Sequence, residues 1–138
     1  MPASEAVEMY LSNKNSILMG THSFWQGIDF KGDLLRAVII MKLPFIVPDY
    51  PPLAAKSEHI ERQGLSPFIH LHVPETIIKF KQGFGRLIRS CSDKGIIAVL
   101  DSRLYSRVYG EKFLNSLPKC NIVFGIKKLS EEYEKLIK

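Results

Sequence analysis

The stretches RAVIIMK (residues 36–42) and GIIAVLD (residues 95–101) decide the fold class of this chain. Each is a short apolar run rich in β-branched side chains, which is typical of a buried β-strand. Two further runs, SILMG (residues 16–20) and residues 121–126, are also expected to form strands. Near-continuous apolar strands separated by helical patterns predict an α/β fold with a mostly parallel sheet covered on both faces.

Helices are expected between and around these strands. Their ends are marked by proline in a first turn, glycine after a last turn and the limits of the amphipathic period. The expected helices span residues 4–12, 52–63 (stopped by Gly64), 74–90, 102–116 and 130 onward. Ligands of such sheets bind outside the carboxyl ends of the strands, which directs attention to residues 21–29, 43–49 and 101–103.

The composition of the chain is that of one ordinary globular domain. Its 138 residues are 46% hydrophobic and 24% charged, enough for a single core over residues 1–138. No apolar run approaches the length of a membrane span, and no signal peptide is visible, so a cytoplasmic location without a membrane partner is expected. Cys91 and Cys120 show no metal-binding spacing, and His70 and His72 share a strand-like face without a third ligand, so no metal site is expected.

The positive charge of the chain is concentrated. The net charge is +5, and residues 79–107 alone carry seven basic and two acidic side chains. Concentrated positive charge favours partners that carry phosphate, either nucleic acid or nucleotide. A solvated basic face without a ligand is the alternative reading of the same pattern.

The segment 74–90 is the most informative of the expected helices. On a helical wheel its polar side chains fall in one arc of roughly 80°, and its apolar side chains fall in a separate arc. The polar arc contains Lys79, Gln82, Arg86 and Arg89. Two arginines and a glutamine on one face make a credible phosphate clamp, although an amphipathic helix with solvated arginines has the same pattern. The mid-helix glycines Gly83 and Gly85 suggest the close approach of a backbone or a phosphate.

The turn at residues 20–29 carries a second, weaker signal. Hydroxyl groups and backbone amides directly after a strand can contact phosphate oxygens. Gly27 allows the backbone to turn sharply. Asp29 can accept hydrogen bonds from a sugar or form an ion pair with an arginine. Asp101 is expected to cap the helix that follows it.

Four segments in this order resemble the DinG/XPD branch of the superfamily 2 helicases. GTHSFWQGIDF (residues 20–30) resembles motif V, and QGFGRLIRS (residues 82–90) fits motif VI, Q-x-x-G-R-x-x-R, at every defined position. LPFIVPDYPP (residues 43–52) and LDSRL (residues 100–104) resemble further segments of that branch. The resemblance implies a RecA-like (P-loop NTPase-type) three-layer sandwich, which would be a partial second lobe of an ATP-dependent DNA repair helicase.

The resemblance also implies roles for individual residues. Arg89 would be the arginine finger on the γ-phosphate, with Arg86 as its partner and Gln82 as a positioner. The implied nucleotide-binding residues are Gly27, Asp29 and Gly85, and the implied contacts to single-stranded DNA are Thr21 and Ser23. Gln26 stands where many relatives carry glutamate, so a charge-dependent role at that position is not implied.

The chain lacks other parts of such an enzyme. It has no G-x-x-x-x-G-K-[ST] loop and no acidic magnesium motif, so ATP and Mg²⁺ would be bound mainly by a first RecA-like lobe. An iron–sulfur cluster could exist in the parent protein, but two cysteines cannot hold one here. A fragment without ATPase activity of its own is therefore expected. The alternatives are the helicase-like module of an exonuclease-fused DinG-type protein and a non-catalytic nucleic-acid-binding module.

Overall fold

The computed structural model describes residues 2–13, 15–21, 24, 35–46, 51–88 and 94–137. The elements in chain order are α1 (Ala3–Ser12), β1 (Ala37–Ile40), α2 (Pro51–Arg62), the π-helix η3 (Phe68–His72), α3 (Val73–Leu87), β2 (Ile96–Val99), α4 (Arg103–Ser106), α5 (Gly110–Asn115) and α6 (Ile126–Ile137). Helices and strands thus occur in one chain, as the α/β prediction requires.

The strands β1 and β2 form a small parallel sheet. Ala37 lies opposite Ile96, and the pairing continues in register until Ile40 lies opposite Val99. One more ladder bond follows, in which the Leu100 N–H donates to the Ile40 carbonyl at 2.9 Å. Both strands come from the two stretches with the strongest strand pattern, and their parallel pairing confirms that part of the prediction.

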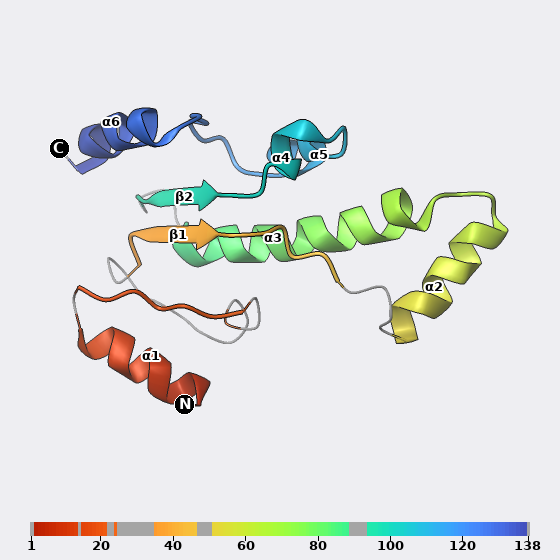
Figure 1. Cartoon of the computed structure of the whole chain (residues 1–138), viewed down its shortest axis with the longest axis horizontal. Helices are drawn as coiled ribbons and strands as arrows, with labels where there is room; N and C mark the ends of the chain where they lie inside the picture. The colour runs from red at the N-terminus through yellow and green to blue at the C-terminus, as the bar shows by residue number, and fades with distance from the viewer. Residues whose placement is uncertain are drawn as a thin grey trace.

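Helix α3 covers one face of this sheet and runs antiparallel to the strands (Figure 1). Along β1 the exposure alternates, because Ile40 is 2% exposed while the adjacent Ile39 is 61% exposed. The buried core consists of Ile40, Leu43, Val73, Phe80 and Phe113. The other face, which carries Ile39, is open in the described part of the chain, so the expected cover on both faces is not found there.

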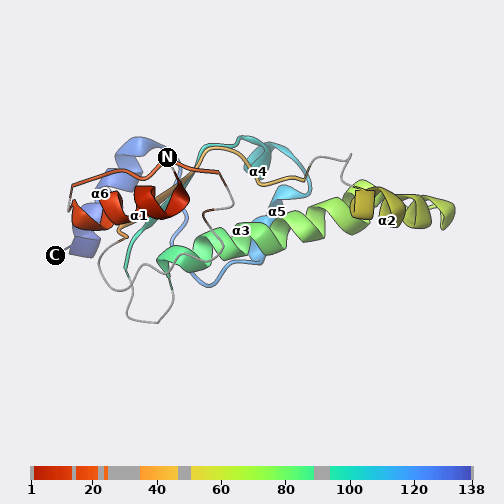
Figure 2. The same ribbon diagram turned by 90° about the horizontal axis from the view of Figure 1, so that it is seen from below.

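The helix α3 is longer than the sheet and extends past it. Its N-terminal part continues from η3, which in turn packs against α2 (Figures 1 and 2). Helix α2 ends at Arg62, just before the predicted stop at Gly64, whose φ of +73° is a conformation that glycine adopts without a steric penalty. The segment with His70 and His72 is helical, so the expectation that the two histidines share a strand-like face is wrong.

Two of the expected strands do not form. Residues 16–20 and 121–125 contain no strand, although both segments are described in the structure. Ile17 and Met19 are 88% and 87% exposed, so the apolar run that suggested a strand lies on the surface. A strand needs a paired neighbour for its backbone groups, and local hydrophobicity does not supply one.

The helix expected over residues 102–116 is divided into α4 and α5. The division lies at residues 107–109, where Arg107 adopts an extended conformation with ψ 141°. The second part then packs closely on the first, because Gly110 brings its backbone against the Leu104 carbonyl. The last helix, α6, begins at Ile126 rather than at residue 130, directly after Gly125 with φ +88°.

Candidate functional site

Helix α3 runs opposite to the strands (Figure 1). Its last residues therefore lie at the end of the sheet where the strands begin, and the residues that follow the strands lie at the other end. At the amino end of the sheet, where both strands begin, a Cβ added to Gly95 would lie 2.7 Å from Leu87 Cδ1, close to the end of α3. At the carboxyl end, the strands lead into Met41 and Leu100. A four-residue strand spans ~13 Å, so these two ends form separate sites.

The amino end carries the motif VI helix with the expected division into two faces. The apolar arc is buried, with Phe80 at 0%, Leu87 at 6% and Phe84 at 9% exposure. On the polar arc, Gln82 is exposed and Arg86 is half-buried. The prediction that α3 packs one face on the core and presents the other is therefore confirmed.

Helix α3 ends earlier than the sequence predicts. Its last residue is Leu87, and Ile88 has the extended backbone values φ −108° and ψ 107°. Because the helix does not continue to residue 90, the helical-wheel angle predicted for Arg89 no longer follows from a continuous helix. Arg89 itself lies outside the described residues.

The two glycines of α3 have different surroundings. Gly83 is buried on the side of the core, whereas Gly85 is exposed. A Cβ added to Gly85 would meet no atom of the described chain within 4 Å. The described residues around α3 therefore give no packing reason for glycine at position 85.

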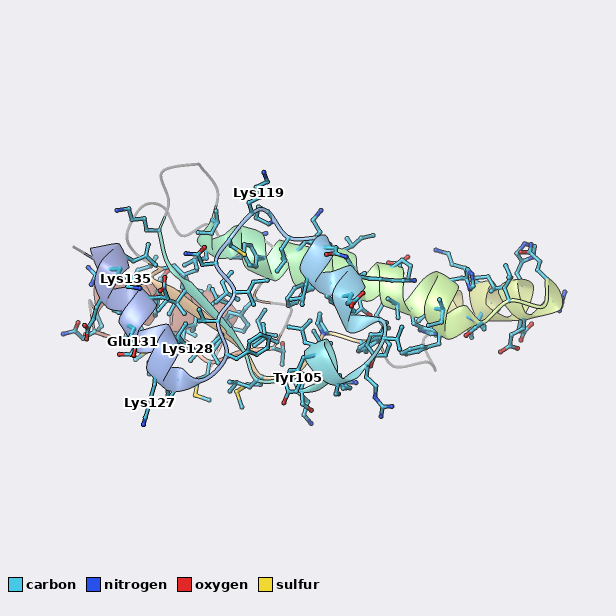
Figure 3. The ribbon with its side chains drawn as sticks, turned by 90° about the horizontal axis from the view of Figure 1, so that it is seen from above. Tyr105, Lys119, Lys127, Lys128, Glu131 and Lys135 are labelled. Atoms are coloured by element: carbon cyan, nitrogen blue, oxygen red, sulfur yellow. The ribbon has the colours of Figure 1, made fainter. Side chains whose placement is uncertain are left out.

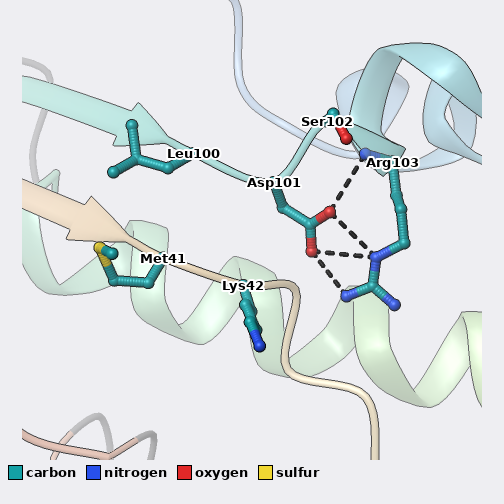
Figure 4. Close-up of a pocket in the computed structure, with 6 residues that line it drawn as sticks. All are labelled: Met41, Lys42, Leu100, Asp101, Ser102 and Arg103. Carbon is teal, nitrogen blue, oxygen red and sulfur yellow. Dashed lines mark hydrogen bonds and ion pairs between the residues drawn. The ribbon is translucent and has the colours of Figure 1, made fainter.

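The carboxyl end is organised around Asp101, which is 9% exposed (Figure 4). Its Oδ2 accepts the Leu43 N–H at 2.8 Å and thereby ties the chain after β1 to the chain after β2. The Arg103 side chain donates Nε to Oδ1 at 2.9 Å and Nη2 to Oδ2 at 2.6 Å. The Arg103 N–H also donates to Oδ1 at 3.1 Å, so Asp101 binds the first residue of α4, whereas the N-cap position itself is Ser102, which makes no side-chain capping bond.

These donors stabilise the charged form of the Asp101 carboxylate. The hydrogen bonds from the Arg103 side chain are the largest effect, and together with the backbone donors they lower the pKa of Asp101 to about 2 despite its burial. The same pairing raises the pKa of Arg103. Both groups are therefore fully charged at neutral pH, and Asp101 is not available as a general base.

An aromatic cluster supports Arg103 from the other side. The guanidinium carbon lies 5.1 Å from the centroid of the Phe45 ring, within the range of a cation–π contact. Phe45 also stacks on Phe68 with centroids 5.6 Å apart and meets Tyr109 edge-on at 5.9 Å. The carboxyl end is thus held by side chains from η3, α4 and α5 as well as from the two strand ends.

Motif V is described only in part. Thr21 is exposed, and its carbonyl accepts the Phe24 N–H at 3.0 Å. Segment 15–21 runs in the same direction as β1 (Figure 1), so it leads toward the carboxyl end of the sheet. The other predicted motif V residues, Ser23, Gly27 and Asp29, lie outside the described residues together with Arg89. Of the predicted site residues, the described part of the chain contains Thr21 and, on α3, Gln82, Gly85 and Arg86.

Sequence reasoning missed Lys42 and underestimated Arg103. Both line one open pocket at the carboxyl end, with a volume of about 440 Å³. The signal that could have found them was present, because Lys42 ends one expected parallel strand and Arg103 lies two residues after another, and such ends meet at one edge of a sheet. Long-range pairing, which the sequence does not show, was needed to combine them.

The described residues contain no helix that is long and apolar enough to cross a membrane. In the same part of the chain, no three histidine, cysteine, aspartate or glutamate side chains come close enough together to hold a metal ion.

Comparison with known proteins identifies the relatives of this chain. It is 45% identical over 123 residues to the ATP-dependent DNA helicase YoaA of Haemophilus influenzae, which is 89% of this chain and 19% of that protein. It is 43% identical over 116 residues to the 3′-5′ exonuclease DinG of Bacillus subtilis, covering 84% of this chain and 12% of the relative. The ATP-dependent DNA helicase DinG of Photobacterium profundum is 49% identical over 107 residues, 78% of this chain and 16% of the relative.

The chain thus spans less than a fifth of the length of each of these relatives. The resemblance to DinG-like helicases that motifs V and VI suggested is confirmed by these identities. The helicase C-terminal domain family matches residues 1–120, which is most of the chain. This chain therefore belongs to the helicase C-terminal domain family and is similar to the DinG and YoaA helicases.

Proposed function

We propose that this chain is the C-terminal lobe of a DinG-like ATP-dependent DNA helicase that works in DNA repair. The observation that carries the proposal is the family match over residues 1–120 together with an α3 helix whose polar face bears the motif VI residues Gln82 and Arg86. In this proposal the lobe is RecA-like and folds as a three-layer sandwich. The described part of that sandwich consists of the parallel strands β1 and β2 and the helix α3 that runs antiparallel to them. We also place the protein in the cytoplasm, where its DNA lies.

The amino end of the sheet is the proposed nucleotide face. Arg89 acts as the arginine finger on the γ-phosphate of ATP, Arg86 assists it, and Gln82 positions the reacting groups. Gly85 supports this assignment, because its exposed position beside open space allows a phosphate or another backbone to approach closely. Gly27 and Asp29 of motif V complete this face in the proposal.

Most of the ATP and the Mg²⁺ would be bound by a first RecA-like lobe. The described residues do not fit a magnesium site, because Asp101 is bound to Arg103 and Leu43 and no acidic cluster exists among them. This lobe would supply positive charge to the developing negative charge of the transition state, and the first lobe would hold the metal.

The carboxyl end is the proposed DNA face. Thr21 and Ser23 would contact the backbone of single-stranded DNA, and segment 15–21 leads toward this end. Placing ATP at one end of the strands and DNA at the other gives a physical route for coupling, since α3 and the strands join the two faces rigidly through the core.

A second candidate function has one observation in its favour. The Bacillus subtilis relative, 43% identical to this chain, is named a 3′-5′ exonuclease. In that version the chain would be the helicase-like module of an exonuclease-fused DinG-type protein. Nuclease activity of the parent that persists after Arg89→Ala, without any ATP-driven unwinding in the unmodified protein, would favour it over the helicase.

The test is the substitution Arg89→Ala in the full helicase that contains this chain. DNA-stimulated ATP hydrolysis should fall by about 10³-fold or more, because an arginine finger contributes ~10³–10⁵ to the rate. Binding of a fluorescent ATP analogue should change little, since the first lobe holds most of the nucleotide. The isolated 138-residue chain should hydrolyse no ATP.

Arg107→Ala is the matched control for this experiment. Arg107 is an exposed arginine that follows α4, on the side of the sheet opposite to the proposed nucleotide face. Its removal should leave hydrolysis within about twofold of the unmodified enzyme. Loss of ATP binding in Arg89→Ala with an intact maximal rate would contradict the finger assignment, and DNA-stimulated turnover by the isolated chain would contradict the lobe assignment.

A further inference from the structure

The open pocket at the carboxyl end of the sheet has no role in the nucleotide face or in motif V. Residues 41–42 after β1 and residues 100–103 after β2 line it, and its volume is about 440 Å³ (Figure 4). This volume lies within the range of small-ligand sites, and the ends of parallel strands are the usual place for them. Its lining combines two cations, one carboxylate, one hydroxyl group and two apolar side chains.

The cations give this pocket a net positive charge. Lys42 is exposed and makes no ion pair with a described residue, while Arg103 is paired with the single carboxylate, Asp101. In that pair, Nε and Nη2 of the guanidinium donate to the carboxylate, and Nη1 makes no bond to Asp101. Figure 4 shows Lys42 and the guanidinium of Arg103 pointing to the same side of the strand ends.

The pairing with Asp101 orients Arg103 for an external ligand. Two side-chain nitrogens and the backbone N–H of Arg103 are fixed on one carboxylate, and the Phe45 ring lies 5.1 Å from the guanidinium carbon. A guanidinium held in this way loses little further side-chain freedom when Nη1 donates to a phosphate oxygen. Ser102, exposed beside it, adds a hydroxyl donor.

The apolar part of the lining indicates a ligand larger than a free anion. Met41 and Leu100 are 66% and 60% exposed, so the pocket offers contact area for a sugar or a base. Tyr105, two residues after Arg103, is 69% exposed and meets the exposed Phe124 edge-on at 6.2 Å (Figure 3). Exposed aromatic rings beside cationic groups are the usual components of surfaces that bind single strands by stacking.

We propose that this pocket binds one nucleotide of single-stranded DNA. The backbone phosphate lies between Lys42 Nζ and Arg103 Nη1, the sugar and base rest on Met41 and Leu100, and Tyr105 stacks on a neighbouring base. The proposal rests on the DNA-binding function proposed above and adds to it a contact outside motif V. In this proposal, the segments that follow β1 and β2 contact the same single strand of DNA.

The test is binding of a fluorescein-labelled oligothymidylate to the 138-residue chain, measured by anisotropy at several NaCl concentrations. Lys42→Ala should weaken binding about fivefold at 0.1 M salt and reduce the slope of log affinity against log salt by about 1, because one phosphate contact is lost. Lys42→Arg should restore both values. Leu100→Ser should weaken binding without changing the slope, since it removes an apolar contact.

Lys94→Ala is the matched control, because Lys94 is an exposed lysine just before β2, at the amino end of the sheet. It should leave affinity and slope close to those of the unmodified chain. Equal effects of Lys42→Ala and Lys94→Ala would overturn the pocket while leaving DNA binding intact. An unmodified chain that folds by circular dichroism but does not bind the oligonucleotide would overturn the DNA-binding function and the pocket together.

Discussion

The two ends of the sheet differ in the contacts that surround them among the described residues. At the carboxyl end, Asp101 accepts hydrogen bonds from Leu43 and Arg103, and Phe45 packs on the same guanidinium. At the amino end, α3 stops at Leu87, and the exposed Gly85 has open space beside it. The carboxyl end is thus held together by contacts within this chain, whereas at the other end the described residues leave the surface beside Gly85 uncovered.

The substitution Gly110→Ala is expected to have the largest effect on stability and to act on the carboxyl end. An added Cβ would lie 1.9 Å from the Leu104 carbonyl oxygen, so α5 would have to move away from α4. Because the obstacle is backbone, we expect a loss of about 3 kcal/mol in the free energy of unfolding. Urea unfolding followed by circular dichroism measures it, and a change below 0.5 kcal/mol (about the scatter of surface substitutions) would show that the two helices are loosely joined.

The substitution Asp101→Asn should remove the central acceptor without changing the shape of the side chain. It leaves Arg103 without its carboxylate and weakens the bond from the Leu43 N–H, so we expect a loss of about 2 kcal/mol. Glu111→Gln, an exposed carboxylate on α5, is the control and should be nearly neutral. Similar unfolding midpoints for the two variants would contradict the organising role of Asp101.

The pH dependence of stability offers a third test of the carboxyl end. The pKa of Asp101 is about 2 in the folded chain and 3.8 without these interactions, so the unfolded chain binds the proton more readily. The stabilisation is complete above the unfolded pKa and is lost as the pH falls from about 4 to 2, up to about 2 kcal/mol. Asp101→Asn should remove this part of the acid dependence, and an unchanged profile between pH 4 and 2 would refute the assignment.

The smallest expected effect, and one of opposite sign, belongs to the amino end. Gly85→Ala should stabilise the isolated chain by about 1 kcal/mol, because alanine favours the helix and its Cβ would meet no described atom. In the parent helicase the same change should lower the rate of ATP hydrolysis. Destabilisation of the isolated chain would show that the space beside Gly85 is filled, and the contrast with Gly110 would disappear.

Local sequence patterns predicted the helices better than the strands. The amphipathic period of α3 and the glycine after α2 depend on interactions between residues a few positions apart, and both predictions were confirmed. Helix ends were less predictable, because the break at Arg107 and the early end at Leu87 depend on what each segment packs against. The strand predictions for residues 16–20 and 121–126 were wrong because hydrophobic runs do not reveal their pairing partners.

One part of the candidate site could be predicted from the sequence, and another part could not. Motifs V and VI were recognisable from sequence, and the comparisons confirmed the family that they indicated. The roles of all the predicted site residues stay predictions, and Arg89, Gly27, Asp29 and Ser23 also lie outside the described part of the chain. The pocket formed by Lys42 and Arg103 joins residues about 60 positions apart and becomes visible only when β1 and β2 pair.

The sequence by itself therefore determined the family, the amphipathic α3 and the two apolar stretches that pair as strands. Only the tertiary structure decided that α3 ends at the amino end of the sheet while Asp101 and Arg103 lie at the carboxyl end. The physical reason is that helical periodicity is a local property of the chain, whereas the partners of a strand end or a buried carboxylate are set by contacts between distant segments.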